Sequence, residues 1–187
     1  MAYRSGTYVA FHAEGNSDPT ETDMKYYRLL QAWHKHKAIE FSLVNSHDKA
    51  SAVRDSSKRD TLRRSLLERL RNSRNMVLII GDTTRFDTDW VPFEIEQAID
   101  TYEIPIIAAY PAYINITNPA ATRALWPAAL AQRIDNGTAH VIHIPFRQAP
   151  TTDAIDQFDH EHYPLNGGLG GYSYQTYVNW GLVQNSA

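Results

Sequence analysis

The sequence predicts an α/β fold in which a parallel sheet of five strands, in the order 2-1-3-4-5, carries helices on both faces. Three observations lead to this prediction. Short runs rich in β-branched and aromatic residues alternate with segments whose apolar residues recur at helical spacing. One run, NMVLII over 75–80, is almost wholly apolar, as in a strand covered on both faces. No internal repeat or low-complexity linker divides the 187 residues, which we interpret as a single domain.

The first quarter of the chain contains a strand, a helix and a second strand. The run TYVAFH over 7–12 is rich in β-forming residues and ends in a polar turn, which predicts the first strand. After this turn, Tyr26, Leu30 and Trp33 recur at i, i+4 and i+7, the spacing of a helix that lies on a sheet. The run FSLVN over 41–45 predicts the second strand.

The middle of the chain supplies the buried centre of the predicted sheet. Leu62, Leu66 and Leu70 share one face of a helix, and Asp60 is placed to cap its start. The apolar run that follows, 75–80, is expected to be the central strand.

A further helix is expected to begin near Trp90, because Pro92 belongs in a first turn, where its missing N–H group costs nothing. Its predicted core stripe consists of Val91, Ile95, Ala98, Ile99 and Tyr102. The run IPIIAAY over 104–110 predicts the fourth strand.

The last third of the chain is predicted to add one helix, one strand and a tail. A helix interrupted by Pro127 is expected within 122–134, and the fifth strand is expected over 140–146. The segment 151–171 is interpreted as a mobile flap, and 172–182 as a last helix or turn.

The alternation of strands and helices predicts parallel β–α–β units with right-handed crossovers, in the flavodoxin-like order. We place the core of the single domain at about 7–147, with 148–187 as a C-terminal extension packed on it.

Composition argues against several classes of function and partner. Asp and Glu total 21 against 18 Lys and Arg, so the formal charge of −3 offers no general attraction for nucleic acid or for an anionic membrane. The chain has no cysteine, which excludes disulfides and thiolate chemistry and fits a reducing compartment. It lacks the apolar region of a signal peptide and any apolar run of about 20 residues, so we expect a cytoplasmic protein.

In an open parallel sheet, ligands bind beyond the carboxyl ends of the strands. The residues expected there follow the first three strands or stand in the first turn of the next helix. They are Phe11, His12, Asn45, Asp48, Asp82, Thr84, Arg85, Trp90 and Glu94. Among them, Arg85 is placed to meet a phosphate.

Trp90 and Glu94 stand four residues apart and therefore project from the same side of their helix, beside its buried stripe. Two interpretations fit this spacing. An acidic residue in a first turn stabilises a helix through the helix dipole. Alternatively, the carboxylate borders an accessible hollow at the ligand edge and acts in a catalytic site.

Three segments resemble the TIR-like domain family, and in particular the TIR proteins of the ThsB type from bacterial Thoeris anti-phage systems. They are VAFHAE from Val9, the segment from Tyr26 to Asp48 and the segment from Leu62 to Tyr110, so that the resemblance covers about 7–110. Within it, Trp90 and Glu94 match the Trp-x-x-x-Glu signature of TIR domains that cleave NAD+. The chain departs from many TIR domains after the first strand, where Ala10-Phe11-His12 replaces a pattern that contains a serine.

The resemblance implies that NAD+ is the substrate and not a cofactor, that Glu94 is the catalytic acidic residue, and that Trp90 shapes the site and steers the product towards cyclisation. It also implies a homo-oligomer in the active state, a phage-derived trigger, and an effector protein that the product nucleotide activates. No cofactor and no metal are expected, and the sequence contains neither a Gly-rich dinucleotide motif nor a P-loop.

A single carboxylate is sufficient for this reaction, because the nicotinamide of NAD+ is already cationic and leaves as a neutral ring. A general acid is therefore not needed, and one anion near the ribose can stabilise the oxocarbenium ion. Glu94 is expected to hydrogen-bond to the ribose hydroxyls, and Trp90 and Phe11 to offer aromatic faces to a ring. Water would give ADP-ribose, attack from within the molecule a cyclic isomer, and another nucleophile a conjugate.

Two other functions fit the same sequence. A TIR-like interaction module would use Trp90 and Glu94 structurally and would act by self-assembly. An enzyme similar to nucleoside deoxyribosyltransferases would also pair a flavodoxin-like sheet with a key carboxylate.

Two further groups of polar residues are interpreted as surface features. The basic segment 49–74 is expected to be a solvated helix face, because no aromatic residues interleave with its basic side chains. His160 and His162 lack the spacing of a helical zinc motif and are interpreted as loop residues.

Overall fold

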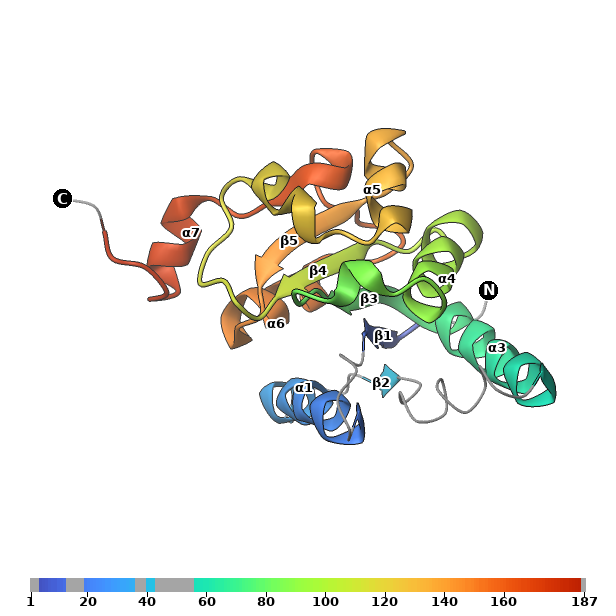
Figure 1. Cartoon of the computed structure of the whole chain (residues 1–187). Coiled ribbons are helices and arrows are strands. Elements are labelled where there is room, and N and C mark those ends of the chain that lie inside the picture. Colours follow the sequence, from blue (N-terminus) through green and yellow to red (C-terminus); the bar gives the residue numbers. More distant parts are fainter. Residues whose placement is uncertain (1–3, 13–18, 36–39, 43–55, 186–187) are drawn as a thin grey trace.

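The computed structural model describes residues 4–12, 19–35, 40–42 and 56–185. Its centre is a parallel sheet in the order β2-β1-β3-β4-β5-β6, with helices on both faces (Figure 1). The strands are β1 (Gly6–Phe11), β2 (Phe41–Ser42), β3 (Ser73–Ile79), β4 (Ile106–Tyr110), β5 (Val141–Pro145) and β6 (Gly170–Gly171). The predicted order 2-1-3-4-5 is confirmed, and a sixth strand extends the sheet beyond β5.

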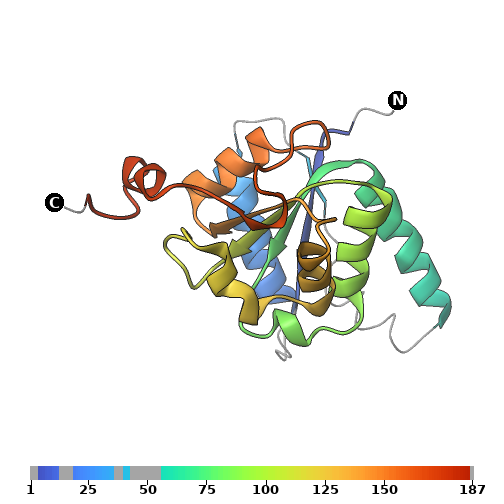
Figure 2. The same ribbon diagram turned by 90° about the horizontal axis from the view of Figure 1, so that it is seen from above.

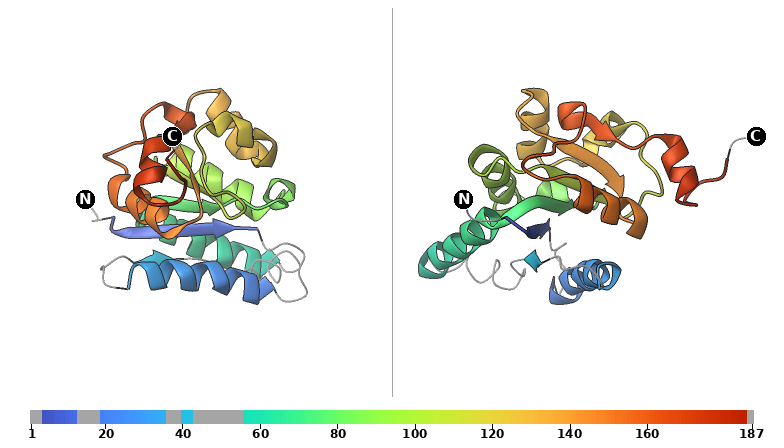
Figure 3. Two further views of the ribbon diagram at one scale, coloured as in Figure 1. Left: turned by 90° about the vertical axis from the view of Figure 1, so that its left-hand side faces the viewer. Right: turned by 180° about the vertical axis from the view of Figure 1, so that it is seen from behind.

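The larger helices divide between the two faces of the sheet (Figures 1 and 2). One face is covered by α1 (Pro19–Trp33) and α6 (Gln148–Gln157), and the other by α3 (Ser56–Arg71), α4 (Trp90–Glu96) and α5 (Ala128–Asp135). The last helix, α7 (Tyr174–Asn179), lies at the opposite end of the molecule from α3 (Figure 3). No helix in the described part of the chain combines the length and the apolar character that a bilayer crossing requires.

Short helical turns complete the connections. The π-helical turn η2 (Gln97–Thr101) continues α4. The 3-10 turns are η1 (Thr84–Phe86), η3 (Pro119–Leu125) and η4 (Gly167–Leu169).

Each face of the sheet has its own apolar core, because successive residues of a strand point to opposite faces. On β1, Tyr8 and Ala10 pack with α3, α4 and α5, whereas Val9 and Phe11 pack with α1 and α6. β3 lies between β1 and β4, and its residues from Asn75 onward are buried. The prediction that the run 75–80 forms a central strand is therefore confirmed.

Helix α3 begins at Ser56, so the prediction of Asp60 as its cap is wrong. The first turn is wholly polar and has no apolar periodicity, although Lys58 and Arg59 are good helix formers. The predicted apolar face is confirmed, because Leu66 and Leu70 are fully buried.

The two proline-based boundaries are confirmed. α4 begins at Trp90 with Pro92 in its first turn, and the expected helix around Pro127 is broken into η3 and α5. The expected second strand begins at Phe41, and its last residues, 43–45, lie outside the described residues.

The interpretation of 151–171 as a mobile flap is wrong. Residues 148–157 form α6, in which Ala154 and Ile155 are fully buried against the sheet. Farther on, Gly170 pairs with Ile142 of β5. A Cβ atom on Gly170 would lie 2.6 Å from the carbonyl oxygen of Val141, so only glycine allows this close approach.

A buried polar network joins β5 to the C-terminal segment. Nε2 of His143 lies 3.0 Å from the carbonyl oxygen of Gly168, which can only accept, so Nε2 carries the proton. Nδ1 therefore accepts from the Tyr110 hydroxyl at 2.8 Å, and that hydroxyl accepts from Trp126 and Thr122. Burial lowers the pKa of His143 to about 4, so the network holds the neutral ring.

Candidate functional site

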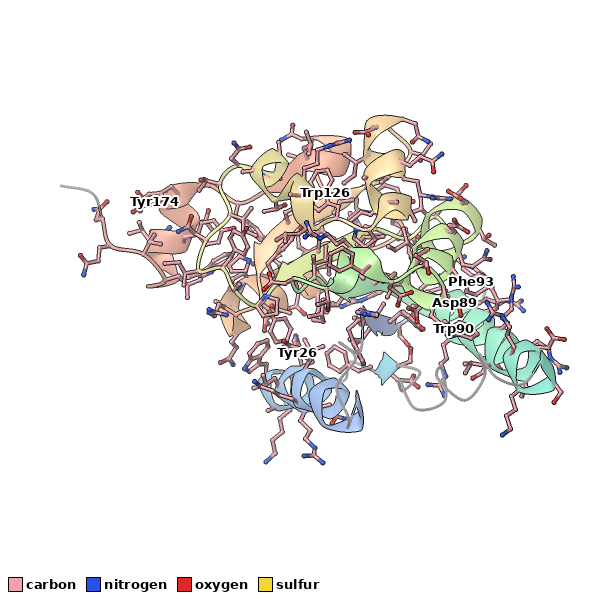
Figure 4. The ribbon with its side chains drawn as sticks, in the orientation of Figure 1. Tyr26, Asp89, Trp90, Phe93, Trp126 and Tyr174 are labelled. Atoms are coloured by element: carbon pink, nitrogen blue, oxygen red, sulfur yellow. The ribbon has the colours of Figure 1, made fainter. Side chains whose placement is uncertain are left out.

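Trp90 and Glu94 lie where α4 leaves the carboxyl edge of the sheet. Both side chains are buried, Trp90 at 5% exposure and Glu94 at 0%. Figure 4 shows Trp90 beside Asp89 and Phe93, with α3 running past them. The Trp90 and Phe93 rings meet edge to face, with centroids 6.4 Å apart.

The carboxylate of Glu94 is held by a tyrosine from the neighbouring strand. The Tyr8 hydroxyl, also fully buried, donates to Oε1 of Glu94 at 2.6 Å. Burial, then the negative charge of Glu94 and this hydrogen bond, raise the pKa of Tyr8 well above its usual value, while the positive charge of Arg69 acts in the opposite direction. Tyr8 therefore stays a protonated donor.

Glu94 does not point into bulk solvent: its side chain is fully buried, so the structure does not present the exposed carboxylate that was expected at the ligand edge. With no exposed surface, its carboxylate can meet a substrate only after neighbouring groups move. A cavity of about 600 Å³ lies at the other edge of the sheet, beside His140 and Tyr163. Because His140 directly precedes β5, this cavity lies at the amino edge, away from the candidate site.

Asp87 joins the start of α4 to the end of β1. Its Oδ1 accepts hydrogen bonds from the backbone N–H groups of Asp89, at 2.8 Å, and Trp90, at 3.1 Å. Its Oδ2 lies 3.0 Å from Nδ1 of His12, the first residue after β1. One carboxylate thus forms an Asx turn with the backbone at the start of α4 and also contacts the histidine.

Helix α3 covers the aromatic side of α4 with two arginines. Arg59 forms an ion pair with Asp89, and its guanidinium lies 5.1 Å from the centroid of the Trp90 ring. Arg63 lies 4.4 Å from the centroid of Phe93. Both guanidinium groups therefore stack on rings supplied by α4. Arg63 is nevertheless exposed, as the interpretation of the basic segment as a solvated helix face predicts, whereas Arg59 is partly buried.

In the loop after β3, Thr84 and Arg85 hydrogen-bond to the protein backbone, whereas Asp82 is exposed. Thr84 is buried, and its Oγ1 accepts from the backbone N–H of Gly81 at 2.9 Å. Arg85 reaches the carbonyl oxygen of Ala124 at 2.8 Å and lies over the ring of Phe86. Asp82 is exposed at the same edge.

The structure does not bring all the predicted residues together. Phe11 belongs to the core on the α1 and α6 face, whereas Trp90 belongs to the core on the α4 face. The two rings are therefore separated by the sheet. Asn45 and Asp48 lie outside the described residues.

A comparison with known families matches residues 8–116 to the TIR-like domain of the Thoeris protein ThsB. The chain belongs to this family. The matched part of the TIR-like domain begins at Tyr8 and includes Asp87, Trp90 and Glu94, so the contacts that surround Glu94 and the start of α4 lie inside it. A comparison with curated proteins found no match.

Sequence reasoning missed Tyr8, Asp87 and Arg59 as parts of this TIR-like site. Asp87 stands two residues before Asp89, the spacing of an Asx turn at the start of a helix, and could have been found. A tyrosine inside an apolar strand signals that its hydroxyl needs a buried partner. Nothing in the sequence identifies Glu94 as that partner, because the contact depends on how α4 packs on β1.

Proposed function

We propose that this TIR-like chain is an enzyme that cleaves NAD+ and releases nicotinamide. Its product would be an ADP-ribose derivative, cyclic by the resemblance to TIR domains with the same signature, that serves as a signal in bacterial anti-phage defence. Glu94 is the catalytic carboxylate, and Trp90 shapes the site.

One observation carries this proposal. Glu94 is a carboxylate in a buried position, held by the Tyr8 hydroxyl at 2.6 Å, in the first turns of α4 and four residues after Trp90. A surface residue that served only the helix dipole would need neither burial nor a tyrosine partner. Membership of the ThsB family gives this arrangement its chemical context.

The chemistry needs one anion and little else. When the bond between nicotinamide and ribose breaks, its electrons neutralise the pyridinium ring, and positive charge appears on the ribose. A carboxylate in a dry site stabilises that charge more strongly than one in water. Glu94 supplies such a carboxylate, and Tyr8 keeps it in one position.

The enclosed state of Glu94 supports a resting form of the enzyme. NAD+ reaches the carboxylate only when the surroundings of α4 open, and we propose that a phage-derived trigger or self-assembly into a homo-oligomer produces that opening. The product would then activate a separate effector protein. In this proposal, the enzyme is active only in infected cells.

The same burial favours one competing function. A carboxylate that is fully enclosed and hydrogen-bonded is also what a purely structural role, joining α4 to β1, would require. In that case the chain would be an interaction module that acts by self-assembly. The two functions differ in one measurable outcome, the consumption of NAD+.

The test compares the parent chain with Glu94→Gln and Glu96→Gln, each expressed in cells with and without phage infection. Nicotinamide and ADP-ribose derivatives are measured by mass spectrometry after NAD+ is added to the extracts. We expect Glu94→Gln to lower the rate by about 100-fold or more. Glu96 lies on the same helix with its side chain 47% exposed, so its substitution controls for the change of charge. Equal nicotinamide release by the parent and Glu94→Gln would remove Glu94 from the mechanism.

A further inference from the structure

His12 and Asp87 form a histidine–carboxylate pair at the same edge of the sheet as Glu94. Nδ1 of His12 lies 3.0 Å from Oδ2 of Asp87. Because a carboxylate only accepts, Nδ1 carries the proton and Nε2 of the neutral ring keeps its lone pair. Nε2 has no hydrogen-bond partner among the residues that the structure describes, and the side chain is 25% exposed.

The pair faces the same side of the sheet as Glu94. Tyr8, Ala10 and His12 alternate along β1, so His12 lies on the side where Tyr8 contacts Glu94. Asp87 supports this placement, because it contacts His12 and also accepts from the backbone N–H of Trp90, the first residue of α4. Four residues of strand place His12 about 13 Å from Tyr8 along β1, at the carboxyl end of the strand.

We propose that His12 is a catalytic base that accepts the proton of the group attacking the ribose, with Asp87 as its positioning residue. This inference rests on the proposed function. The bond from C1′ to nicotinamide breaks first, and its electron pair leaves with the ring. A hydroxyl, from water or from the same nucleotide, then forms a bond to C1′, and its proton passes to Nε2 of His12.

Asp87 makes this step favourable in two ways. Its hydrogen bond holds the imidazole with the lone pair of Nε2 outward, and its negative charge stabilises the imidazolium that forms. Glu94 is enclosed with Tyr8 and serves the ribose cation, so the proton needs this second acceptor.

The test uses three variants and a matched control. His12→Ala removes the base. Asp87→Asn keeps the oxygen that accepts from the backbone at the start of α4. Its amide, however, donates to Nδ1 and so places the proton on Nε2, the wrong tautomer. The control is His162→Gln, because His162 makes the same 3.0 Å contact with Asp159 on a distant exposed loop. Glu94→Gln reports on the proposed function itself.

We expect His12→Ala and Asp87→Asn each to lower kcat by about 100-fold or more, with a much smaller change in KM. Added imidazole should restore His12→Ala at least tenfold and leave Asp87→Asn unchanged, an effect that a structural defect would not show. His162→Gln should match the parent. Circular dichroism confirms that each variant is folded.

Two results would overturn the inference while leaving the proposed function intact. One is an unchanged kcat for His12→Ala when Glu94→Gln is inactive, and the other is a slow His12→Ala enzyme that imidazole does not accelerate. If the parent consumes no NAD+ in extracts of either infected or uninfected cells, both proposals fall together.

Discussion

Replacing Tyr8 with phenylalanine tests whether Glu94 is a buried anion. The substitution removes one oxygen atom and leaves the ring in the core between β1 and α4. The lost contact is the 2.6 Å hydrogen bond that the hydroxyl donates to Oε1 of Glu94. Both side chains have no exposed surface, so water does not replace the donor unless the structure opens.

The size of the effect follows from the charge of the acceptor. A hydrogen bond to a charged group contributes about 1.5–3 kcal/mol, against about 1 kcal/mol for a neutral pair. We therefore expect Tyr8→Phe to lower the free energy of unfolding by about 2 kcal/mol. At this chain length, that loss lowers the melting temperature by about 4–8 °C.

The chain offers a matched control in Tyr177. This tyrosine is also fully buried, but its hydroxyl donates to a neutral acceptor, the carbonyl oxygen of Ile116, at 3.2 Å. Tyr177→Phe should therefore cost about 1 kcal/mol. Urea unfolding followed by circular dichroism gives both values, and the double variant Tyr8→Phe with Glu94→Gln gives the coupling between the two residues.

The comparison has a clear refuting outcome. If Tyr8→Phe costs no more than Tyr177→Phe, the Tyr8 hydroxyl does not stabilise a buried negative charge. If the free-energy change of the double variant equals the sum of the changes in the two single variants, Tyr8 and Glu94 act independently. Either result would remove the physical reason for treating Glu94 as a charge held in readiness for a cationic sugar.

Two further predictions concern β5 and the C-terminal segment that packs against it. The pKa of His143 is about 4 in the fold and about 6.5 in an unfolded chain, so the unfolded state binds more protons between these two values. The free energy of unfolding should therefore be highest above about pH 6.5 and fall by up to about 3 kcal/mol as the pH drops to about 4. Urea unfolding across this range should show that drop in the parent, and a His143→Gln variant with an equal drop would contradict it. Gly170→Ala should cost about 1–3 kcal/mol, because its Cβ would lie 2.6 Å from the carbonyl oxygen of Val141. Gly6→Ala, whose Cβ would have 3.4 Å to its nearest atoms, is the control, and equal melting temperatures for the two variants would contradict the steric argument.

The positions of the first five strands could be predicted because local patterns carry them, and their order followed from the flavodoxin-like arrangement of parallel β–α–β units. The apolar run 75–80 and the periodic leucines at 62, 66 and 70 report burial directly, and both are confirmed. β6 could not be predicted in the same way. It consists of Gly170 and Gly171, and its position depends on the absence of a Cβ beside β5, which only the packed structure reveals.

The candidate site was predictable in part for a similar reason. The spacing of Trp90 and Glu94 follows from helix geometry alone, and the structure has both on one buried side of α4. Alternation along β1 shows that Tyr8 and His12 share a face, but not that this face meets α4. Phe11 was expected to contact the same ligand ring as Trp90. Because successive residues of β1 point to opposite faces, however, Phe11 packs in the core on the α1 and α6 face.

The depth of Glu94 is a consequence of how the start of α4 is fixed. Asp87 connects it to His12 at the end of β1, and Asp89 connects it to Arg59 of α3. With Trp90 held at the rim in this way, four residues of helix place Glu94 about 6 Å farther along the helix axis. Under the proposed function, this offset would place the nicotinamide ring near Trp90 and the attached ribose near Glu94. If Glu94 acts as proposed, a change that loosens the start of α4, such as Arg59→Ala, should impair the proposed NAD+ cleavage without any direct contact to the sugar. An unaltered kcat and KM in that variant would show that the Arg59–Asp89 ion pair does not position the carboxylate.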